Sequence, residues 1–349
     1  MKTILITGAA GFIGARLVSE LIEGEEPYNL VCLDNLNSYY DPSLKGYRLD
    51  EIRNRIKKTD SKCVFTFYKG DISNANVVDN IFRTYNIDIV VNLAAQAGVR
   101  YSIVNPDAYI ESNIVGFHNI LKACSKSKTV EQFIYASSSS VYGDNPITPY
   151  SESSDTDMPV SLYAATKKSN ELMAYAYSSM YKLPATGLRF FTVYGEAGRP
   201  DMAYYKFADM MVKGHKIPLY NNGDCVRDFT YVGDVVKGII KIIENGQAAY
   251  VSNQTVPHKI YNIGCSSPVR LMDFVKCLHQ SLIEVGALSE FHSLDESIEY
   301  LPKQCGDVDK TFSDSTEIFY DYDITPEVNI EDGLMAFAKW YKEYNNINS

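Results

Sequence analysis

The sequence lacks the patterns that mark a metal site, a disulfide framework or a membrane span. Its seven cysteines are scattered singly among 349 residues without a Cys-x-x-Cys pair, and its five histidines are isolated. An odd, dispersed set predicts reduced thiols and no metal, as in a cytoplasmic protein. No apolar run approaches the roughly 20 residues that a transmembrane helix needs. Glycines interrupt the apolar stretch 4–13, so it is not expected to be a signal sequence.

Positive charge is also scarce. Lysine and arginine total 33 against 43 aspartates and glutamates, which gives a net charge of −10. This balance argues against nucleic acid or an anionic membrane as the main partner, because both attract basic surfaces. An anionic substrate would therefore have to be bound by local arginines. The chain exceeds the size at which one core usually stops growing, so one large or two unequal domains are expected.

Short apolar stretches alternate with helical patterns over the first half of the chain. The expected strands are 3–7, 28–33, 87–93, 132–136 and 184–190. This alternation predicts a parallel sheet covered by helices on both faces. The segment 191–227 is rich in glycine and proline, and after it a helix at 234–244, a strand at 259–263 and an amphipathic helix at 334–344 are expected.

A glycine-rich turn follows the first expected strand. Gly8, Gly11 and Gly14, with Phe12 and Ile13 between the last two, would let the backbone approach a pyrophosphate at a helix N-terminus. Asp34, followed by Asn35, ends the second strand 20 residues after Gly14. A carboxylate there accepts hydrogen bonds from ribose hydroxyls and repels a 2′-phosphate, so NAD is predicted in preference to NADP.

Further cofactor contacts are expected at the ends of later strands, where such a sheet binds adenine and ribose. These candidates are Asp71, Ile72, Leu93, Ala94 and Ala95. The predicted fold is α/β, a Rossmann-type doubly wound parallel sheet with a smaller C-terminal α/β substrate lobe. We assign residues 1–188 to the NAD-binding domain, to which the chain returns at about 228–262, and residues 189–227 and 263–349 to the substrate lobe.

Tyr163 and Lys167 are four residues apart in the expected helix 159–181 and follow Ser138 by 25 and 29 residues. Residues at this spacing share one helix face. A free phenol titrates near ~10, but a cation about 4 Å away at an effective dielectric of ~20 stabilises the phenolate by roughly 4 kcal/mol and lowers the pKa by ~3. A serine hydroxyl at a strand end can relay the proton. The trio predicts the oxidation of a substrate hydroxyl.

These motifs, in this order, resemble the extended short-chain dehydrogenase/reductase family over nearly the whole chain. The segments that look like nucleotide-sugar 4-epimerase signatures are 34–41, 94–102, 189–195 and 227–231. The stretch 198–203, Gly-Arg-Pro-Asp-Met-Ala, looks like UDP-glucuronate 4-epimerases. Glu196 and Ala197 depart from the Pro-aromatic pair usual before Gly198, where the change could alter the shape of the sugar pocket.

The resemblance implies a role for individual residues. Ser138 would be the hydroxyl relay, which Ser139 or Ser140 could share, Tyr163 the base, and Lys167 its activator and ribose anchor. Asn113 would lie near the cofactor, Arg227 near the UDP phosphates and Asp307 at the uridine ribose. The full set of substrate contacts expected is Arg100, Ser138, Ser139, Ser140, Thr192, Arg199, Ala203, Arg227 and Asp307. Arg189 is either one more functional arginine or a structural residue at a strand end.

The predicted reaction is 4-epimerisation of UDP-glucuronate to UDP-galacturonate through a 4-keto sugar, with transient hydride transfer to tightly bound NAD that is regenerated in each turnover. Arg199 is predicted to bind the C6 carboxylate, because a guanidinium matches a carboxylate in two-point geometry. The 4-keto sugar is a β-keto acid that readily loses carbon dioxide, so Arg199, Thr192 and one of Ser139 or Ser140 are expected to restrain the carboxylate. Alternatively, Arg199 is a solvated loop arginine or forms an ion pair between the lobes.

Other functions are compatible with the same motifs. They are a 4-epimerase of UDP-glucose or UDP-N-acetylhexosamine, a decarboxylase or dehydratase of the same fold, and a non-catalytic NAD-binding scaffold. The helical stretches 102–124 and 159–181 could pair across a two-fold axis as a four-helix interface. A homodimer is therefore expected, mainly on the resemblance, and no nucleic acid or membrane partner.

Overall fold

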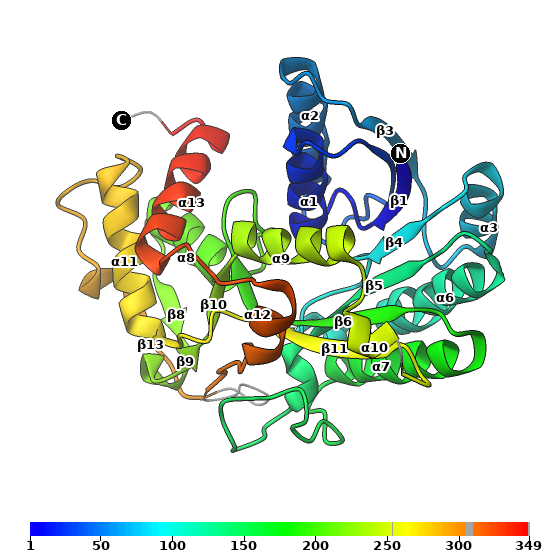
Figure 1. Ribbon diagram of the computed structural model, residues 1–349. Helices are drawn as coiled ribbons and strands as arrows, with labels where there is room; N and C mark the ends of the chain where they lie inside the picture. Colours follow the sequence, from blue (N-terminus) through cyan, green and yellow to red (C-terminus); the bar gives the residue numbers. More distant parts are fainter. Residues whose placement is uncertain (253, 304–309, 348–349) are drawn as a thin grey trace.

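The computed structural model describes residues 1–252, 254–303 and 310–347. A seven-stranded sheet, parallel throughout, forms its centre (Figure 1). The strands, in their spatial order, are β11 (His258–Ile263), β6 (Ala185–Phe190), β5 (Gln132–Ser138), β4 (Ile89–Asn92), β1 (Lys2–Thr7), β2 (Tyr28–Asp34) and β3 (Val64–Lys69). The chain leaves β1 toward β2 on one side and reaches β4 on the other, so the strand order reverses beside β1. Ligands of open parallel sheets bind outside the carboxyl ends of the strands at such a point.

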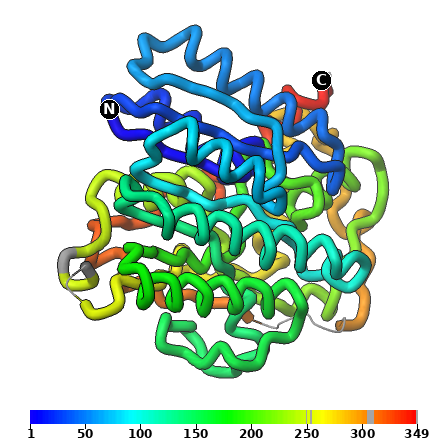
Figure 2. Tube along the Cα trace, turned by 90° about the vertical axis from the view of Figure 1, so that its right-hand side faces the viewer, coloured from blue at the N-terminus to red at the C-terminus, as the bar shows by residue number. Residues whose placement is uncertain are grey.

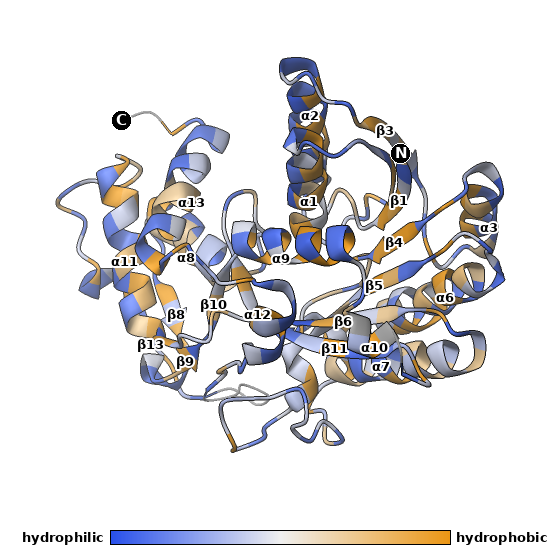
Figure 3. Cartoon of the chain, viewed as in Figure 1, coloured by the Kyte–Doolittle hydropathy of each residue, from blue (hydrophilic) through white to orange (hydrophobic). Residues whose placement is uncertain are grey.

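Alternate residues of the central strands enter two different cores. Ile4 and Ile6 of β1 belong to one apolar cluster, whereas Leu5 belongs to another. This is the period of two expected for a strand that is buried on both faces. One face is covered by α1 (Phe12–Glu23), α2 (Pro42–Lys58) and α9 (Val232–Asn245), and the other by α3 (Ala75–Thr84), α6 (Phe117–Lys126) and α7 (Leu162–Tyr181). In Figure 3 the strands and the helix sides turned toward them carry most of the hydrophobic colour.

The smaller lobe lies at one side of the sheet (Figure 1). It contains three two-stranded sheets, which pair β7 (Thr192–Tyr194) with β10 (Phe229–Tyr231), β8 (Ile217–Leu219) with β13 (Ile298–Tyr300), and β9 (Val226–Arg227) with β12 (Val269–Arg270). Its helices include α8 (Ala203–Val212), α11 (Leu271–Glu284) and α13 (Ile330–Tyr344), whereas α12 (Thr316–Tyr322) packs against β11 and α9 of the sheet half. One apolar cluster extends from Ile4 of β1 to Tyr341 of α13, so the lobe shares a core with the sheet.

The described ranges also contain shorter helical segments. They are α4 (Tyr101–Val104), α5 (Pro106–Tyr109), the π-helix η1 (Ile110–Gly116), η2 (Ser139–Tyr142), η3 (Tyr220–Gly223), α10 (Ala249–Ser252) and η4 (Asp295–Ser297). No helix in the described ranges combines the length and apolar composition needed to cross a bilayer. The six cysteines outside the gaps are free thiols.

The predicted α/β class and parallel sheet are confirmed. The expected helix 102–124 is broken into segments, because Pro106 has no amide hydrogen to continue a helix and instead begins α5. The helix expected from Pro159 begins at Leu162, where the Ser161 side chain accepts a hydrogen bond from the amide of Ala164. The proposed domain boundary at residue 188 falls inside β6, and the division itself remains a prediction.

Candidate active site

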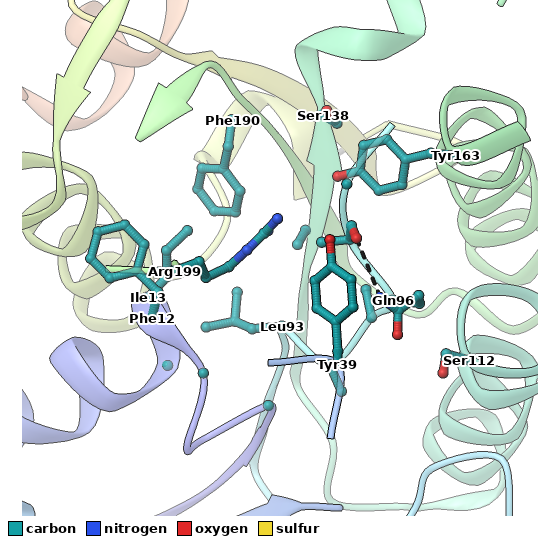
Figure 4. A pocket seen from close by; sticks show the side chains of 18 of the residues that line it. Phe12, Ile13, Tyr39, Leu93, Gln96, Ser112, Ser138, Tyr163, Phe190 and Arg199 are labelled. Carbon is teal, nitrogen blue, oxygen red and sulfur yellow. Dashed lines mark hydrogen bonds between the residues drawn. The ribbon is translucent and has the colours of Figure 1, made fainter. Parts of the chain in front are cut away.

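A cleft of about 430 Å³ lies along the carboxyl ends of the strands, where the smaller lobe meets the sheet. It brings together the glycine turn after β1, the ends of β2, β4, β5 and β6, the helix α7 and the loop before α8. Figure 4 shows Tyr163 and Ser138 on one wall, and Arg199 reaching into the space between Phe190 and Tyr39. Residues from distant parts of the sequence therefore face one space.

The glycine turn packs tightly against itself and against the loop after β4. A Cβ on Gly8, whose φ is +71°, would lie 2.7 Å from the amide nitrogen of Ala94, and a Cβ on Gly14 would lie 2.2 Å from the carbonyl oxygen of Gly8. No side chain caps the N-terminus of α1 at Gly11. The first amides of this helix can therefore donate to an anion. Gly8, Gly11, Phe12, Ile13 and Gly14 all line the cleft, and this cradle fits a dinucleotide pyrophosphate.

Asp34 lies at the end of β2, as predicted, and is buried in the cleft wall. Its carboxylate accepts hydrogen bonds from the amides of Ala10, at 3.0 Å, and Leu36, at 2.8 Å. These bonds fix the carboxylate beside the glycine turn, with lone pairs left for ribose hydroxyls. The residues therefore fit NAD, with Asp34 at the ribose end.

The other cofactor candidates separate into two groups. Asn35, Asp71, Ile72, Leu93, Ala94 and Ala95 line the cleft. Burial acts to raise the pKa of Asp71, but hydrogen bonds from Asn35 and Ser73 hold it below its usual value, so the carboxylate is ionised. Asn113 lies behind the wall. Its amide bonds to the backbone of Gln96, at 2.8 and 3.0 Å, and to Thr166, at 3.0 Å, so it holds the loop after β4 against α7.

Tyr163 and Lys167 extend from α7 into the cleft, and Ser138 faces it from the end of β5. The predicted activation of Tyr163 by Lys167 stays a prediction. The Lys167 ammonium donates to the carbonyl oxygen of Ala136 at 2.9 Å, and burial lowers its pKa to about 8. Burial also raises the pKa of Tyr163, and the hydrogen bond with Ser138 and the charge of Arg199 only partly oppose this effect.

The structure separates the roles of the four serines. Ser137 is buried and donates to a carboxylate oxygen of Glu171 at 2.6 Å, so its hydroxyl is occupied. Ser138, Ser139 and Ser140 all line the cleft, and the Ser138 hydroxyl donates to that of Ser140 at 3.1 Å. Ser138 therefore faces Tyr163 with a second hydroxyl directly behind it.

Arg189 belongs to a buried structural pair. Its Nε and Nη2 atoms donate to the two carboxylate oxygens of Glu171, at 2.8 and 2.9 Å, and Nη1 donates to the Tyr142 hydroxyl at 2.9 Å. Glu171 is one turn beyond Lys167 on α7, and Arg189 is on β6. The pair therefore fixes α7 against the sheet, which supports the structural reading of Arg189.

Arg199 faces the cleft but has a partner in its own loop. Its Nε donates to Asp201 Oδ1 at 3.0 Å and its Nη2 to Oδ2 at 2.5 Å, while the Tyr39 hydroxyl donates to Oδ2 at 3.1 Å. Burial acts to raise the pKa of Asp201, but the bond from Arg199 holds it low, so the pair is ionic. The alternative of an ion pair between the lobes is thus right about the ion pair and wrong about its place, because both partners lie in one loop. Thr192 lines the same space.

Other substrate candidates lie outside the cleft lining. Arg100 stacks over the ring of Tyr220, Arg227 donates to the carbonyl of Val226, and Ala203 begins α8. Asp307 lies outside the described residues.

Sequence reasoning missed several residues of the cleft wall, namely Tyr39, Tyr40, Lys45, Gln96, Phe190 and Met202. The signal for Tyr39 and Tyr40 was present in the segment 34–41. Within the described ranges, no three acidic, histidine or cysteine side chains are grouped as a metal site.

The model of the NAD dependent epimerase/dehydratase family matches residues 4–264. Protein CapI of Staphylococcus aureus is 46% identical, with 98% of each chain covered. UDP-glucuronate 4-epimerase 3 of Arabidopsis thaliana is 39% identical over 99% of this chain and 77% of its own length. The structure of UDP-glucuronic acid 4-epimerase from Bacillus cereus, in complex with UDP-glucuronic acid and NAD, matches with a TM-score of 0.82, 28% identity and coverage of 98% and 99%.

These matches confirm NAD as the cofactor and an isomerase as the class of enzyme. The glycine cradle, Asp34 and the Ser138, Tyr163 and Lys167 set occupy the cleft as the resemblance implied. The chain therefore belongs to the NAD dependent epimerase/dehydratase family, as an NAD-dependent nucleotide-sugar 4-epimerase.

Proposed function

We propose that this epimerase interconverts UDP-glucuronate and UDP-galacturonate through a 4-keto sugar. The observation that carries the proposal is the position of Arg199, which lies in the same cleft as Tyr163 and Ser138. A guanidinium there can bind a sugar carboxylate while the C4 hydroxyl lies at Tyr163. Relatives named as UDP-glucuronate 4-epimerases support the same substrate.

The residues of the cleft have distinct parts in this mechanism. Bound NAD supplies a hydride acceptor that returns the hydride, so no net oxidation occurs. Tyr163, as the phenolate, removes the proton of the 4-hydroxyl, and Ser138 donates a hydrogen bond to the same oxygen. Lys167, which lines the cleft and donates to the carbonyl of Ala136, is assigned to the ribose of the cofactor on the family resemblance. The glycine turn and Asp34 orient the cofactor, and the smaller lobe binds UDP.

Arg199 has N–H donors that Asp201 does not use and that can bind a substrate carboxylate. A guanidinium carries five N–H donors. The hydrogen bonds to Asp201 use the hydrogen of Nε and one hydrogen of Nη2. The Nη1 edge of the guanidinium is therefore left for a ligand in the cleft. With Thr192 and Ser139 or Ser140, this edge would hold the carboxylate so that its bond to C5 does not align with the C4 carbonyl. The restraint opposes loss of carbon dioxide from the β-keto acid.

The Arg199–Asp201 pair also favours a second candidate, because it neutralises part of the charge that a carboxylate would meet. An uncharged sugar, as in UDP-glucose or a UDP-N-acetylhexosamine, would then suit the same cleft. The test is to incubate the purified protein with each UDP-sugar, without added NAD, and to identify the product. UDP-galacturonate formed from UDP-glucuronate supports the first proposal, whereas turnover of only the neutral sugars overturns it.

The proposed assembly is a homodimer through a four-helix interface. Ile103 and Val104 of α4 and Leu172 and Tyr175 of α7 are exposed apolar side chains on neighbouring helices. Exposed apolar groups gathered on one surface of a folded chain are typical of a protein interface. Two copies of these helices, related by a two-fold axis, would cover each other.

A further inference from the structure

Arg48 is a buried cation whose hydrogen bonds all reach oxygens of other segments. It lies on α2 and is 3% exposed. Its Nη1 donates to the carbonyl oxygen of Ala10 at 3.0 Å and to the Tyr40 hydroxyl at 2.6 Å. Nε and Nη2 donate to the carbonyl of Ala197 at 2.9 and 2.7 Å, and Nη2 also to that of Gly198 at 3.1 Å. Its hydrogen-bond partners in the described ranges are thus carbonyl and phenol oxygens and include no carboxylate.

The two groups of carbonyls belong to two segments that are far apart in the sequence. Ala10 is in the glycine turn; its amide donates to Asp34 and its carbonyl accepts from Arg48, so both backbone polar groups of this residue are held. Ala197 and Gly198 directly precede Arg199. One planar guanidinium therefore joins the turn that receives the cofactor to the loop that carries Arg199.

The loop needs this support, because Ala197 has a φ of +50°. A left-handed conformation costs an L-residue other than glycine about 1–2 kcal/mol. Two of the bonds from Arg48 end on the carbonyl of this residue. Glu196 is held as well, since its carboxylate accepts from the Tyr231 hydroxyl at 2.8 Å and lies 3.6 Å from Nη1 of Arg16 on α1. Glu196 and Ala197, where the sequence departs from the family pattern, thus both contact other segments of the molecule.

Charge gives a reason for an arginine at this place. A buried cation without a carboxylate is costly unless oriented dipoles satisfy its donors. No carboxylate accepts a hydrogen bond from Arg48 in the described ranges, and its guanidinium contacts the carbonyl of Ala10 in the glycine turn, where the pyrophosphate of NAD would bind. The anion and the carbonyls of the turn would together stabilise the guanidinium, and a lysine could not make the same forked contacts.

We infer that Arg48 is a positioning residue that couples the cofactor turn to the loop 195–201, so that the contacts that hold NAD also fix Arg199. The inferred coupling depends only on the binding of NAD. The identity of the substrate group that Arg199 binds rests on the proposed function. Because such coupling is reciprocal, loss of Arg48 should loosen both sides together.

The test compares purified holoenzymes carrying Arg48→Met, Arg48→Lys and the control Arg53→Met. Arg53 lies on the same helix, has a side chain 50% exposed and pairs only with Asp50 in the described ion pairs. Five quantities are measured: the rate at which bound NAD is lost on dilution, amide hydrogen exchange of residues 195–202 with NAD bound, the KM for UDP-glucuronate, the kcat, and the affinity for UDP alone.

For Arg48→Met, NAD loss, loop exchange and KM should each rise by about tenfold or more, while kcat and the affinity for UDP alone change by less than about threefold. Arg48→Lys should restore part of each effect, and Arg53→Met should match the wild type. If the loop loosens without faster NAD loss, or NAD is lost without loop exchange, the two loops are independent and the inference is wrong.

Two further outcomes are also decisive. If Arg48→Met does not fold, Arg48→Lys carries the comparison, and equal NAD loss and loop exchange in Arg48→Lys and the wild type overturn the inference. If the wild type does not act on UDP-glucuronate, the proposed function fails, but NAD loss and loop exchange still test the coupling.

Discussion

Burial changes the acid–base properties of Tyr163 and Lys167 in opposite directions. It raises the pKa of the phenol and lowers that of the ammonium to about 8, because both charged forms lose solvation. The phenolate needed for proton removal must therefore be stabilised by neighbours. Ser138 and the charge of Arg199 act in that direction. At neutral pH, the single residue Tyr163 thus depends on the whole wall of the cleft for its function as a base.

Tyr163→Phe should abolish turnover and leave NAD bound. The ring still fills the same space, but the oxygen that accepts the proton is gone. We expect kcat to fall by about 10³-fold or more, with an unchanged ratio of NAD to protein. The control is Tyr101→Phe, which removes a hydroxyl from a neighbouring tyrosine outside the cleft lining. More than a few per cent of wild-type activity in Tyr163→Phe would rule out this role.

Lys167→Met should change how stability depends on pH. The folded-state pKa of Lys167 is lowered from 10.5 to about 8, so below about pH 8 the folded chain bears the full cost of a buried ammonium. Between these values the unfolded chain binds more protons, and the stability of the wild type should rise with pH relative to the variant. Urea unfolding of both proteins at several pH values, with excess NAD, measures this difference. A difference that stays constant from pH 7 to 10.5 would contradict the lowered pKa.

Local elements were predictable from the sequence, and contacts between distant elements were not. The glycine turn, Asp34 at the end of β2 and the Tyr163/Lys167 spacing depend on residues close together in the chain, so strand, turn and helix signals identify them. The Arg48–Ala197 contact joins residues 149 positions apart, and no local pattern encodes it. The acceptor of Lys167 is the carbonyl of Ala136 on β5, 31 residues away, and no local pattern encodes this contact either. The break at Pro106 had a signal, because proline disrupts helices.

The loop 195–201 is the element on which substrate choice should depend. Arg199→Ala removes the proposed restraint on the sugar carboxylate and a charge that favours the Tyr163 phenolate. We expect a lower rate and a larger share of decarboxylated UDP-pentose among the products, by about tenfold relative to the wild type. Nuclear magnetic resonance or mass spectrometry of the products measures that share. The control is the exposed Arg53→Ala, and an unchanged share in Arg199→Ala would refute the restraint.

At the scale of the whole molecule, the exposed apolar surface is uneven. Ile103 and Val104 are 77% and 78% exposed, and Leu172 and Tyr175 are 60% and 52% exposed. In Figure 2 the segment from α4 to α6 and the helix α7 lie side by side on the face turned to the viewer. Tyr163 and Lys167 are on the same helix as Leu172, so a dimer through this face would also hold the catalytic helix in place.

Leu172→Glu should therefore dissociate the proposed dimer. In a two-fold interface each substitution is present twice, and a buried glutamate without a cation is strongly unfavourable. We expect the dimer dissociation constant to rise by about 100-fold or more, which is roughly 2.7 kcal/mol. Sedimentation equilibrium of the wild type and the variant measures it. Phe291→Glu, at a site 86% exposed in the segment after α11, is the matched control and should leave the mass unchanged. A monomeric wild type, or a Leu172→Glu protein that stays dimeric, would show that this face is not the interface.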